Sequence, residues 1–454
     1  MNLPCRVSLG LVLVTSSACG NGGDPADTGA SEETTASEDS QQPTTGGTGE
    51  TGETSATDGT TAGEASTDGT TGEPVLPEGC DALVVPGSDD VEALQGALLE
   101  AAPNSTVCLG EGTFMLNTEI SISQDGLTLK GAGRELSILD FSTQDLGGNG
   151  IKVTGDGVTM LSFTVQETPG DGIRGDSVDD ITYEDVAVIW AAEASLDNGA
   201  YGFYPVGCDG VVIRSSLVRG ARDAGIYVGQ SFNIIVEDNE ASGNVAGIEI
   251  ENSIDATVRR NHTHDNTAGI LIFNLPGLEV KDGKRTLAYE NIVEDNNIAN
   301  FGEPGSVVAA VPPGLGFMIL ASDYNEIRDN EVRNNRSAGI IITQYSELLL
   351  EPFDDAAYDV YAQANYIHDN TFEGNAQDPD ELILTITSGA NPGFDMLLDG
   401  CEDPDVDNAD GAWTNCYSGN GDGTFMDFDL CNGFMMQSTD LAPVTCEHDP
   451  LMAP

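Results

Sequence analysis

The chain has 454 residues, of which 76 are acidic and only 16 basic, and its net charge at pH 7 is −60. Binding of nucleic acid requires clustered Lys and Arg that displace counterions, so this charge balance argues against a nucleic-acid partner. The 55 glycines and the aromatic content of 6% indicate a chain with many turns and an acidic surface.

Residues 1–19 have the pattern of an export signal. Arg6 precedes an apolar stretch at residues 7–14 that is too short to span a bilayer. The next residues, Thr15-Ser16-Ser17-Ala18-Cys19, resemble the bacterial lipoprotein processing box, although Ser16 stands where that box usually has Leu. The resemblance implies lipidation of Cys19, and an ordinary cleaved signal peptide is the alternative. We therefore expect an exported protein of the cell envelope or outer surface, held to a membrane only by this lipid anchor.

Residues 20–75 are rich in Gly, Thr, Ser and Glu and contain no basic residue. Such a segment cannot bury enough apolar surface to offset the entropy lost when it is ordered. We expect a disordered tether that separates the folded body from the membrane.

Export also sets an oxidising context for the cysteines of the folded region. Cys80 and Cys108 are expected to staple its start. Four late cysteines are expected to staple its end in one of three connectivities: Cys401, Cys416, Cys431 and Cys446. The seventh cysteine, Cys208, lies in a strand repeat far from both groups and is expected to be a buried free thiol.

Residues 89–102 are predicted to form an amphipathic helix within an N-terminal cap and first coils at residues 76–125. Val91, Leu94 and Leu98 share one face of this helix. Asp89 and Glu92 have the spacing of a capping box, and the helix stops before residue 103, a proline. We expect the helix to cover the open first coil.

A 22-residue repeat dominates the middle of the chain. Its motif occurs as Ala224-Gly225-Ile226, Ala246-Gly247-Ile248, Ala268-Gly269-Ile270 and, after an insertion, Ala338-Gly339-Ile340. Pairs of Asn five residues apart follow the same register: Asn239 and Asn244, Asn261 and Asn266, Asn291 and Asn296, Asn330 and Asn335, and Asn370 and Asn375. Short β-branched runs cannot bury an apolar face within one repeat, whereas stacked coils can. The repeat predicts an all-β fold, a right-handed parallel β-helix over residues 126–375.

Each kind of repeated residue has an expected place in the coil. The Asn side chains are predicted to point inward at one bend and to bond the next Asn and the turn backbone. The glycines are predicted to supply tight or left-handed backbone at the other bend. Residues 376–454 are predicted to form a Cys-containing C-terminal cap.

Alternation along the strands predicts two columns of outward side chains. One column is Tyr204, Tyr227, Glu249, Leu271, Met318 and Ile341, and the other is Val206, Gly229, Glu251, Phe273, Leu320 and Thr343. Aromatic rings can stack on sugar rings and amides can bond hydroxyls. The candidate substrate-binding residues are therefore Tyr201, Tyr204, Gln230, Asn252 and Asn274. The alternative is that a loop covers the apolar members of the columns.

Three insertions, at residues 276–284, 303–313 and 347–359, are placed to wall in this platform. The first carries Lys281 and Lys284, further candidate substrate-binding residues for an anionic group, with a solvated hairpin tip as the alternative. The candidate catalytic residues are Glu249, Glu251, Tyr227 and Arg222, with the two glutamates as acid and base. Outward acids that are merely solvated are the alternative.

The late acidic segment holds Asp403, Asp405, Asp407 and Asp410, whose alternation is similar to that of a calcium loop without the full EF-hand spacing. Calcium is the only cofactor that the sequence suggests, and nothing in the sequence requires it.

Several motifs resemble those of a family of exported parallel β-helix repeat proteins of unassigned activity, over roughly residues 80–446. They are Asn198-Gly199-Ala200-Tyr201-Gly202-Phe203-Tyr204-Pro205-Val206, Asp223-Ala224-Gly225-Ile226-Tyr227-Val228-Gly229-Gln230-Ser231 and Gly247-Ile248-Glu249-Ile250-Glu251-Asn252-Ser253. The wider pectate-lyase-like superfamily implies polysaccharide lyases, hydrolases and mannuronate epimerases. The active strand of the epimerases reads Tyr-Gly-x-Asp-Pro-His-Asp, and here Tyr204, Val206 and Gly207 replace its Asp, His and Asp. Epimerisation by that triad is therefore not expected.

These features together predict a surface lipoprotein that engages an extracellular polysaccharide. Catalysis, if present, would resemble that of a lyase or a glycoside hydrolase. The alternative is a non-catalytic β-helix that binds or scaffolds at the envelope.

Overall fold

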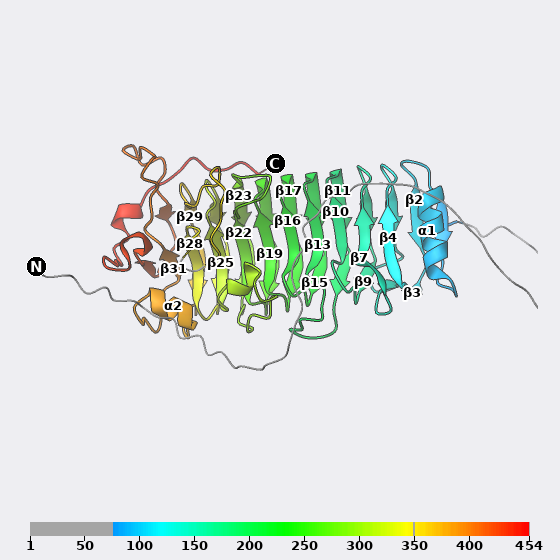
Figure 1. The fold of residues 1–454 in the computed structure, drawn as a ribbon, viewed down its shortest axis with the longest axis horizontal. Coiled ribbons are helices and arrows are strands. Elements are labelled where there is room, and N and C mark those ends of the chain that lie inside the picture. Colours follow the sequence, from blue (N-terminus) through cyan, green and yellow to red (C-terminus); the bar gives the residue numbers. More distant parts are fainter. Residues whose placement is uncertain (1–75, 348–349, 454) are drawn as a thin grey trace, which may run out of the picture. The chain divides into compact units, whose positions relative to one another are not determined.

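The folded part of the chain is a stack of coils, each made of short strands that pair in parallel with the coils before and after it. The computed structural model describes residues 76–347 and 350–453. The predicted signal segment with Cys19 and the predicted tether of residues 20–75 lie outside the described residues. Figure 1 shows the strands side by side, from α1 at one end to β31 at the other.

The strands form three sheets. Sheet A contains β1 (Ala82–Val84), β2 (Thr106–Leu109), β5 (Thr128–Lys130), β8 (Thr159–Leu161), β11 (Asp179–Glu184), β14 (Asp209–Arg214), β17 (Phe232–Glu237), β20 (Ile254–Arg259), β23 (Lys284–Tyr289), β26 (Glu326–Arg328), β29 (Tyr366–His368) and β32 (Cys416–Ser418). Sheet B contains β3 (Gly112–Met115), β6 (Ser137–Asp140), β9 (Thr164–Gln166), β12 (Ala187–Ile189), β15 (Leu217–Arg219), β18 (Glu240–Ser242), β21 (His262–His264), β24 (Ile292–Glu294), β27 (Glu331–Arg333) and β30 (Thr371–Glu373). Sheet C contains β4 (Thr118–Ile122), β7 (Leu146–Val153), β10 (Ile173–Asp176), β13 (Tyr201–Val206), β16 (Ala224–Gly229), β19 (Ala246–Glu251), β22 (Ala268–Phe273), β25 (Leu315–Leu320), β28 (Ala338–Thr343), β31 (Met396–Leu398) and β33 (Phe425–Asp427).

These sheets confirm the predicted parallel β-helix. Inward side chains of all three sheets make one continuous apolar core along the stack, in which Ile226, Ile248 and Ile270 occupy one column. The β-helix extends past residue 375, because β31, β32 and β33 continue sheets A and C within the region predicted as a cap. The 22-residue spacing does not continue in this region because long insertions separate the strands.

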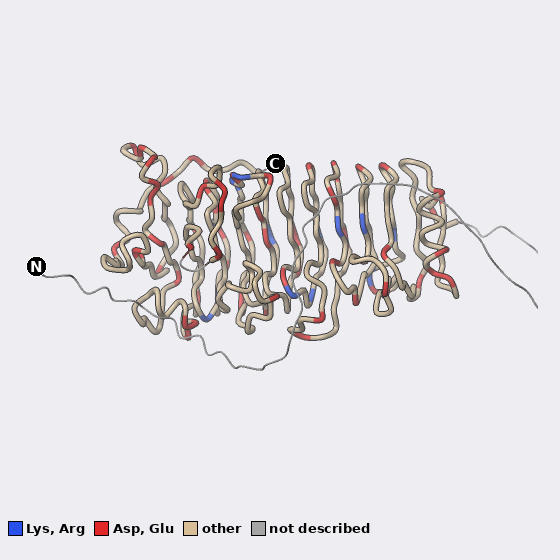
Figure 2. The backbone as a smooth tube through the Cα atoms, viewed as in Figure 1, with Lys and Arg blue, Asp and Glu red and all other residues tan. Residues whose placement is uncertain are grey.

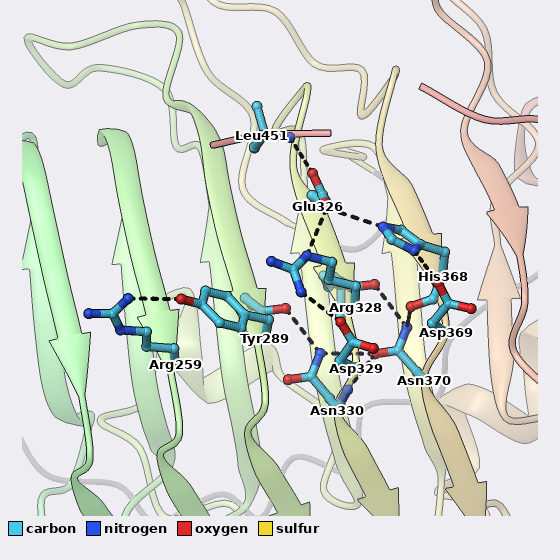
Figure 3. A network of polar contacts seen from close by, with 12 residues as sticks. Arg259, Tyr289, Glu326, Arg328, Asp329, Asn330, His368, Asp369, Asn370 and Leu451 are labelled. Carbon is cyan, nitrogen blue, oxygen red and sulfur yellow. Dashed lines mark hydrogen bonds and ion pairs between the residues drawn. The ribbon is translucent and has the colours of Figure 1, made fainter. Parts of the chain in front are cut away.

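The predicted Asn pairs form buried ladders that run from coil to coil. Asn291 donates its side-chain N–H groups to Oδ1 of Asn330 at 3.0 Å and to the carbonyl oxygen of Val258 at 2.9 Å. Its own Oδ1 accepts from the backbone N–H of Asn261 at 2.9 Å. Figure 3 shows the following rung, between Asn330 and Asn370. The ladder thus satisfies polar groups that the bend would otherwise leave buried without partners.

The repeated glycines serve close approach between coils rather than left-handed backbone. None of Gly225, Gly247 and Gly269 has a positive φ. A Cβ atom added at Gly247 would lie 2.7 Å from the carbonyl oxygen of Gly269, so a larger residue would push the coils apart. The left-handed bends instead hold residues that directly precede a ladder Asn, among them Asp238, Arg260, Glu290, Asp329 and Asp369.

The predicted N-terminal helix is present as α1 (Asp90–Glu100) and packs over the first coil. Leu94 and Leu98 are buried in the core. The predicted capping box is wrong, because the Asp89 side chain makes no capping hydrogen bond. The carboxylate of Asp90 is used instead, accepting from the backbone N–H of Gly87 at 2.6 Å and of Met115 at 2.7 Å. Asp90 therefore ties the helix to β3.

The C-terminal region carries α2 (Glu381–Ile386), two short 3-10 helices and two disulfides. The 3-10 helices of this region are η2 (Leu430–Asn432) and η3 (Ala442–Val444), and a third, η1 (Val308–Ala310), lies in the second insertion. The disulfides join Cys401 to Cys431 and Cys416 to Cys446, and a third joins Cys80 to Cys108 at the start. Cys208 is a buried free thiol, as predicted. Among the described residues, no helix is both long enough and apolar enough to cross a membrane.

After Cys446 the chain turns back over the outer face of sheet A (Figure 3). The backbone N–H of Leu451 donates to the carboxylate of Glu326, which also meets Nε of Arg328 at 3.0 Å and Nε2 of His368 at 3.1 Å. Glu326 is buried, and its three partners compensate for that burial. This cluster holds the C-terminal segment in place.

The ladder generates a stability prediction. Asn291→Ala should lower the free energy of unfolding by about 3 kcal/mol, because the partners in two neighbouring coils lose their hydrogen bonds while staying buried. Urea titration followed by circular dichroism measures this change. Asn117→Ala is the matched control, because Asn117 is exposed and its side chain makes no hydrogen bond within the described residues. Equal stability of the two variants would contradict a structural role for the ladder.

Candidate functional site

The two predicted outer columns exist on sheet C. Tyr227 of β16 pairs with Glu249 of β19, and Glu249 pairs in turn with Leu271 of β22. In the neighbouring column, Glu251 pairs with Phe273. The first column continues toward the N-terminus as Arg174 and Lys152, one residue per coil. One face of the sheet therefore changes along the stack from basic to aromatic, then acidic, then apolar.

The apolar part of this face is not an open platform. Leu271, Phe273 and Leu320 are buried. They belong to a second apolar cluster outside the helix, which includes Val308 and Tyr358 from two insertions. The predicted walls are thus real, and they cover the columns. The remaining cavity there is about 100 Å³ and has no titratable lining residue, so acid–base chemistry has no place in it.

Three tyrosines cluster where this cover ends. The rings of Tyr201 and Tyr204 stack with their centroids 4.5 Å apart, and Tyr227 lies 4.7 Å from the first and 5.0 Å from the second. The guanidinium carbon of Arg174 lies 4.9 Å from the centre of the Tyr204 ring. Tyr201 and Tyr204 are partly exposed, whereas Tyr227 is 5% exposed. The cluster thus presents two aromatic rings to the surface and buries the third.

Four carboxyl groups interact electrostatically within this cluster: Asp171, Asp223, Glu249 and Glu251. The hydroxyl of Tyr227 donates to Oε1 of Glu251 at 2.7 Å, and the hydroxyl of Tyr201 lies 3.3 Å from Oδ2 of Asp223. Glu249 is 3% exposed, and its Oε2 has no hydrogen-bond partner among residues 76–347 and 350–453. Asp171 and Asp223 are partly exposed. Within the site, the two aspartates are therefore partly exposed and the two glutamates are buried.

Burial shifts the pKa values of these carboxyl groups upward. It raises the pKa of Glu251 to about 7. Burial, with the charge of Glu251, raises the pKa of Asp223 to about 7. Burial raises the pKa of Asp171 to about 6 and that of Glu249 well above its usual range. Carboxyl groups that keep protons near neutral pH can act as proton donors.

The basic side chains next to the cluster are already paired with acids. Arg174 meets Asp176 at 3.7 Å and Asp171 at 4.0 Å. Lys152 meets the same Asp176 at 3.1 Å. Arg222, a predicted catalytic residue, donates to Glu303 of the second insertion. It therefore fastens that insertion beside the cluster.

Two of the three amide side chains predicted to bind sugar, those of Asn252 and Asn274, do not face solvent. Asn252 is buried and donates to the carbonyl oxygens of Leu275 and Val280. Asn274 is buried and donates to the carbonyl oxygens of Gly283 and Ala321. These asparagines anchor the first insertion, which corrects their prediction as sugar-binding residues. Gln230 is partly exposed, and its Oε1 accepts from the backbone N–H of Glu279.

The two predicted anion-binding lysines are also engaged. Lys281 pairs with Asp355 and Lys284 with Asp282, each at 2.5 Å. Among the described residues, neither lysine side chain forms a hydrogen bond or an ion pair with the tyrosine–carboxyl cluster. The two lysines of this insertion are therefore not free to bind an anionic group of a substrate.

The predicted calcium segment lies in the C-terminal region, away from this sheet face in the sequence. Asp403, Asp407 and Asp410 each accept a hydrogen bond from the backbone N–H two residues further on. Asp405 is exposed. Within the described part of the chain, no group of three or more His, Cys, Asp or Glu side chains is arranged to hold a metal ion. Calcium binding at this segment stays a prediction.

Sequence reasoning did not predict Asp171 and Arg174 as members of the site, and it did not predict Asp223 as one of its carboxyl groups. Arg174 lies one coil before Tyr204 in the same column, so extending the column by one coil would have found it. The two aspartates precede the strands at the bend, where alternation does not predict their direction.

The buried carboxyls generate a pH prediction. Because their pKa values are raised, these carboxyl groups keep protons in the folded protein that they release in the unfolded chain. The stability that the protonated carboxyl groups contribute in acid is therefore lost as the pH rises from about 4 to about 7. Stability should therefore fall between pH 5 and pH 8, and Glu251→Gln should shrink this fall by about 2 kcal/mol. Urea midpoints at the two pH values measure it. The exposed Glu193 offers the control Glu193→Gln, and an unchanged pH dependence in Glu251→Gln would refute the prediction.

Comparison with known proteins gives a match to the fold. Residues 149–284 match the family model of the right handed beta helix region. The A-modules of the Azotobacter vinelandii mannuronan C-5 epimerases AlgE4 and AlgE6 are similar in structure. AlgE4 has 16% identity and a TM-score of 0.48 over 75% of this chain and 96% of that chain. AlgE6 has 15% identity and a TM-score of 0.45 over 74% and 91%.

Pectate lyase Pel9A is also similar, with 14% identity and a TM-score of 0.36 over 66% of this chain and 80% of that chain. No curated protein sequence matches the chain. At these identities the likeness concerns the fold alone. Both the family match and the three parallel sheets identify the chain as a right-handed β-helix protein.

Proposed function

We propose that the tyrosine–carboxyl cluster on sheet C binds an extracellular polysaccharide and cleaves it by acid–base chemistry. The observation that carries this proposal is the contact between the partly exposed Tyr201 and the carboxyl of Asp223, whose pKa is raised to about 7. Tyr201 and Tyr204 offer stacked rings for a sugar face. A carboxyl beside them that carries a proton at neutral pH is suited to protonate a glycosidic oxygen.

The roles follow from access to solvent. Asp223 is partly exposed and is the proposed proton donor, and Asp171, with its lower pKa of about 6, is the proposed base. Glu251 is 7% exposed, so its role is to raise the pKa of Asp223 through its charge. Tyr227 holds Glu251 in place through its hydroxyl. This assignment moves the proposed proton transfer from the two glutamates to the two aspartates.

A second candidate function is binding without turnover. The burial of Glu249 and Glu251 favours it, because enclosed carboxyl groups cannot touch a polysaccharide without movement of the surrounding residues. On this reading the tyrosines bind the glycan, and the β-helix scaffolds it at the cell envelope.

Turnover assays separate the two candidates. With a panel of polysaccharides, Asp223→Asn should reduce cleavage, followed as reducing ends and unsaturated products, by about 100-fold or more while affinity changes little. Tyr204→Ala should weaken binding instead. Asp179→Asn, an exposed change on β11, is the control and should alter neither. Binding without cleavage by the unaltered protein would favour the scaffold, and the absence of any binding would contradict both candidates.

We also propose that the protein is exported and anchored by a lipid at Cys19. The three disulfides of the folded part support export, because such bonds persist in oxidising compartments. The sequence of residues 15–19 supports the anchor. Mass spectrometry of the mature N-terminal peptide from the native host should find Cys19 acylated. An unmodified Cys19 thiol would rule out the anchor and leave export untouched.

A further inference from the structure

The cationic groups of the site are already neutralised. Asp176 pairs with both Lys152 and Arg174, and Glu303 pairs with Arg222. The lysines of the first insertion, Lys281 and Lys284, are paired as well. A uronic-acid or sulfated chain would bring further negative charge, and it would have to break one of these pairs to gain a counter-charge.

Negative charge is abundant in the molecule as a whole, which has a net charge of −60. Within the cluster, Asp171 has a pKa of about 6 and is therefore mostly ionised at neutral pH. Figure 2 shows acidic residues along the whole set of described coils, with fewer basic residues among them. Like charges that are brought together weaken binding, and the summed field of an acidic protein slows the approach of an anionic ligand.

The polar groups that do remain suit hydroxyls. A carboxylate accepts hydrogen bonds from sugar hydroxyls, and a protonated carboxyl can also donate one. The aromatic side chains of Tyr201 and Tyr204, which are partly exposed, need no charge on their partner. A sugar ring with hydroxyl groups alone therefore meets every part of the site without a charge conflict.

From these contacts we infer that the site takes a neutral glycan and excludes polyanionic ones. The inference rests on the proposed function, since it names the substrate class of the same cluster. The inference also favours a hydrolase over a lyase, because cleavage of a neutral chain by these carboxyls is hydrolysis. Water adds across the glycosidic bond. The leaving oxygen takes the proton of the acid, and the base accepts a proton from water.

The test uses pairs of oligosaccharides that differ only in charge. Each uronic-acid oligosaccharide in a panel is compared with its carboxyl-reduced counterpart, together with neutral hexose oligosaccharides, by calorimetric titration of the full-length protein at low and at physiological salt. A neutral ligand should bind at least about tenfold more tightly than its charged partner, and the gap should narrow as salt screens the repulsion.

Two variants sharpen the test. Asp176→Asn releases Lys152 and Arg174 from their shared partner, so it should raise the affinity for the uronic-acid ligands several-fold and leave the neutral ones unchanged. Asp179→Asn removes one charge from an exposed position without freeing a basic residue, so it should leave the affinities for uronic-acid and for neutral ligands unchanged.

The outcomes distinguish the inference from the proposed function. Equal or tighter binding of the charged member of a pair by the unaltered protein would overturn the neutral-glycan inference and leave a glycan-binding site standing. Binding of no member of the panel would overturn the proposed function and this inference with it.

Discussion

The buried Asn ladder is the interaction on which the rest of this structure depends. Each rung donates one amide hydrogen to the Asn of the next coil and the other to a carbonyl oxygen of the previous coil, from which it also accepts a backbone N–H. Asn291 does so between Asn261 and Asn330. Without the ladder, the bends would leave buried N–H groups and carbonyl oxygens without partners, at a cost that three-residue strands could hardly offset. With it, the coils from Asn239 to Asn420 are held in register with one another. That register places Tyr227, Glu249 and Leu271 in one outer column.

Much of this fold was predictable because a solenoid is specified by local spacing. The 22-residue repeat and the Asn pairs gave the coil, the direction of the strands' side chains and both outer columns. The use of glycine was harder to predict. A column of Gly signals either left-handed backbone or close approach, and only the position of the next coil, as at Gly247 and Gly269, decides between them. The Asp89 capping box failed because Asp90, one residue later, found partners in β3 and the preceding loop.

The site was predictable only in part, for a different physical reason. Alternation correctly predicted that Glu249 and Glu251 point away from the core, yet both are buried in the folded protein. Exposure is a property of the tertiary structure, and no local pattern reports it. Burial of these acids costs free energy, and their raised pKa values express that cost. Several such groups gathered in one place lower the stability of the folded protein, and such groupings are common at functional sites.

The ladder has a further consequence for how such a protein can change over evolutionary time. Successive rungs are separated by 22, 30, 39, 40 and 50 residues, yet their side chains meet at nearly the same distance. The extra residues leave the coil as loops and rejoin it at the next rung. Insertions and deletions in these loops therefore leave the scaffold in register. During evolution, the loops around a sheet face can therefore change, and with them the molecules that the face binds, while the coils and their register stay the same.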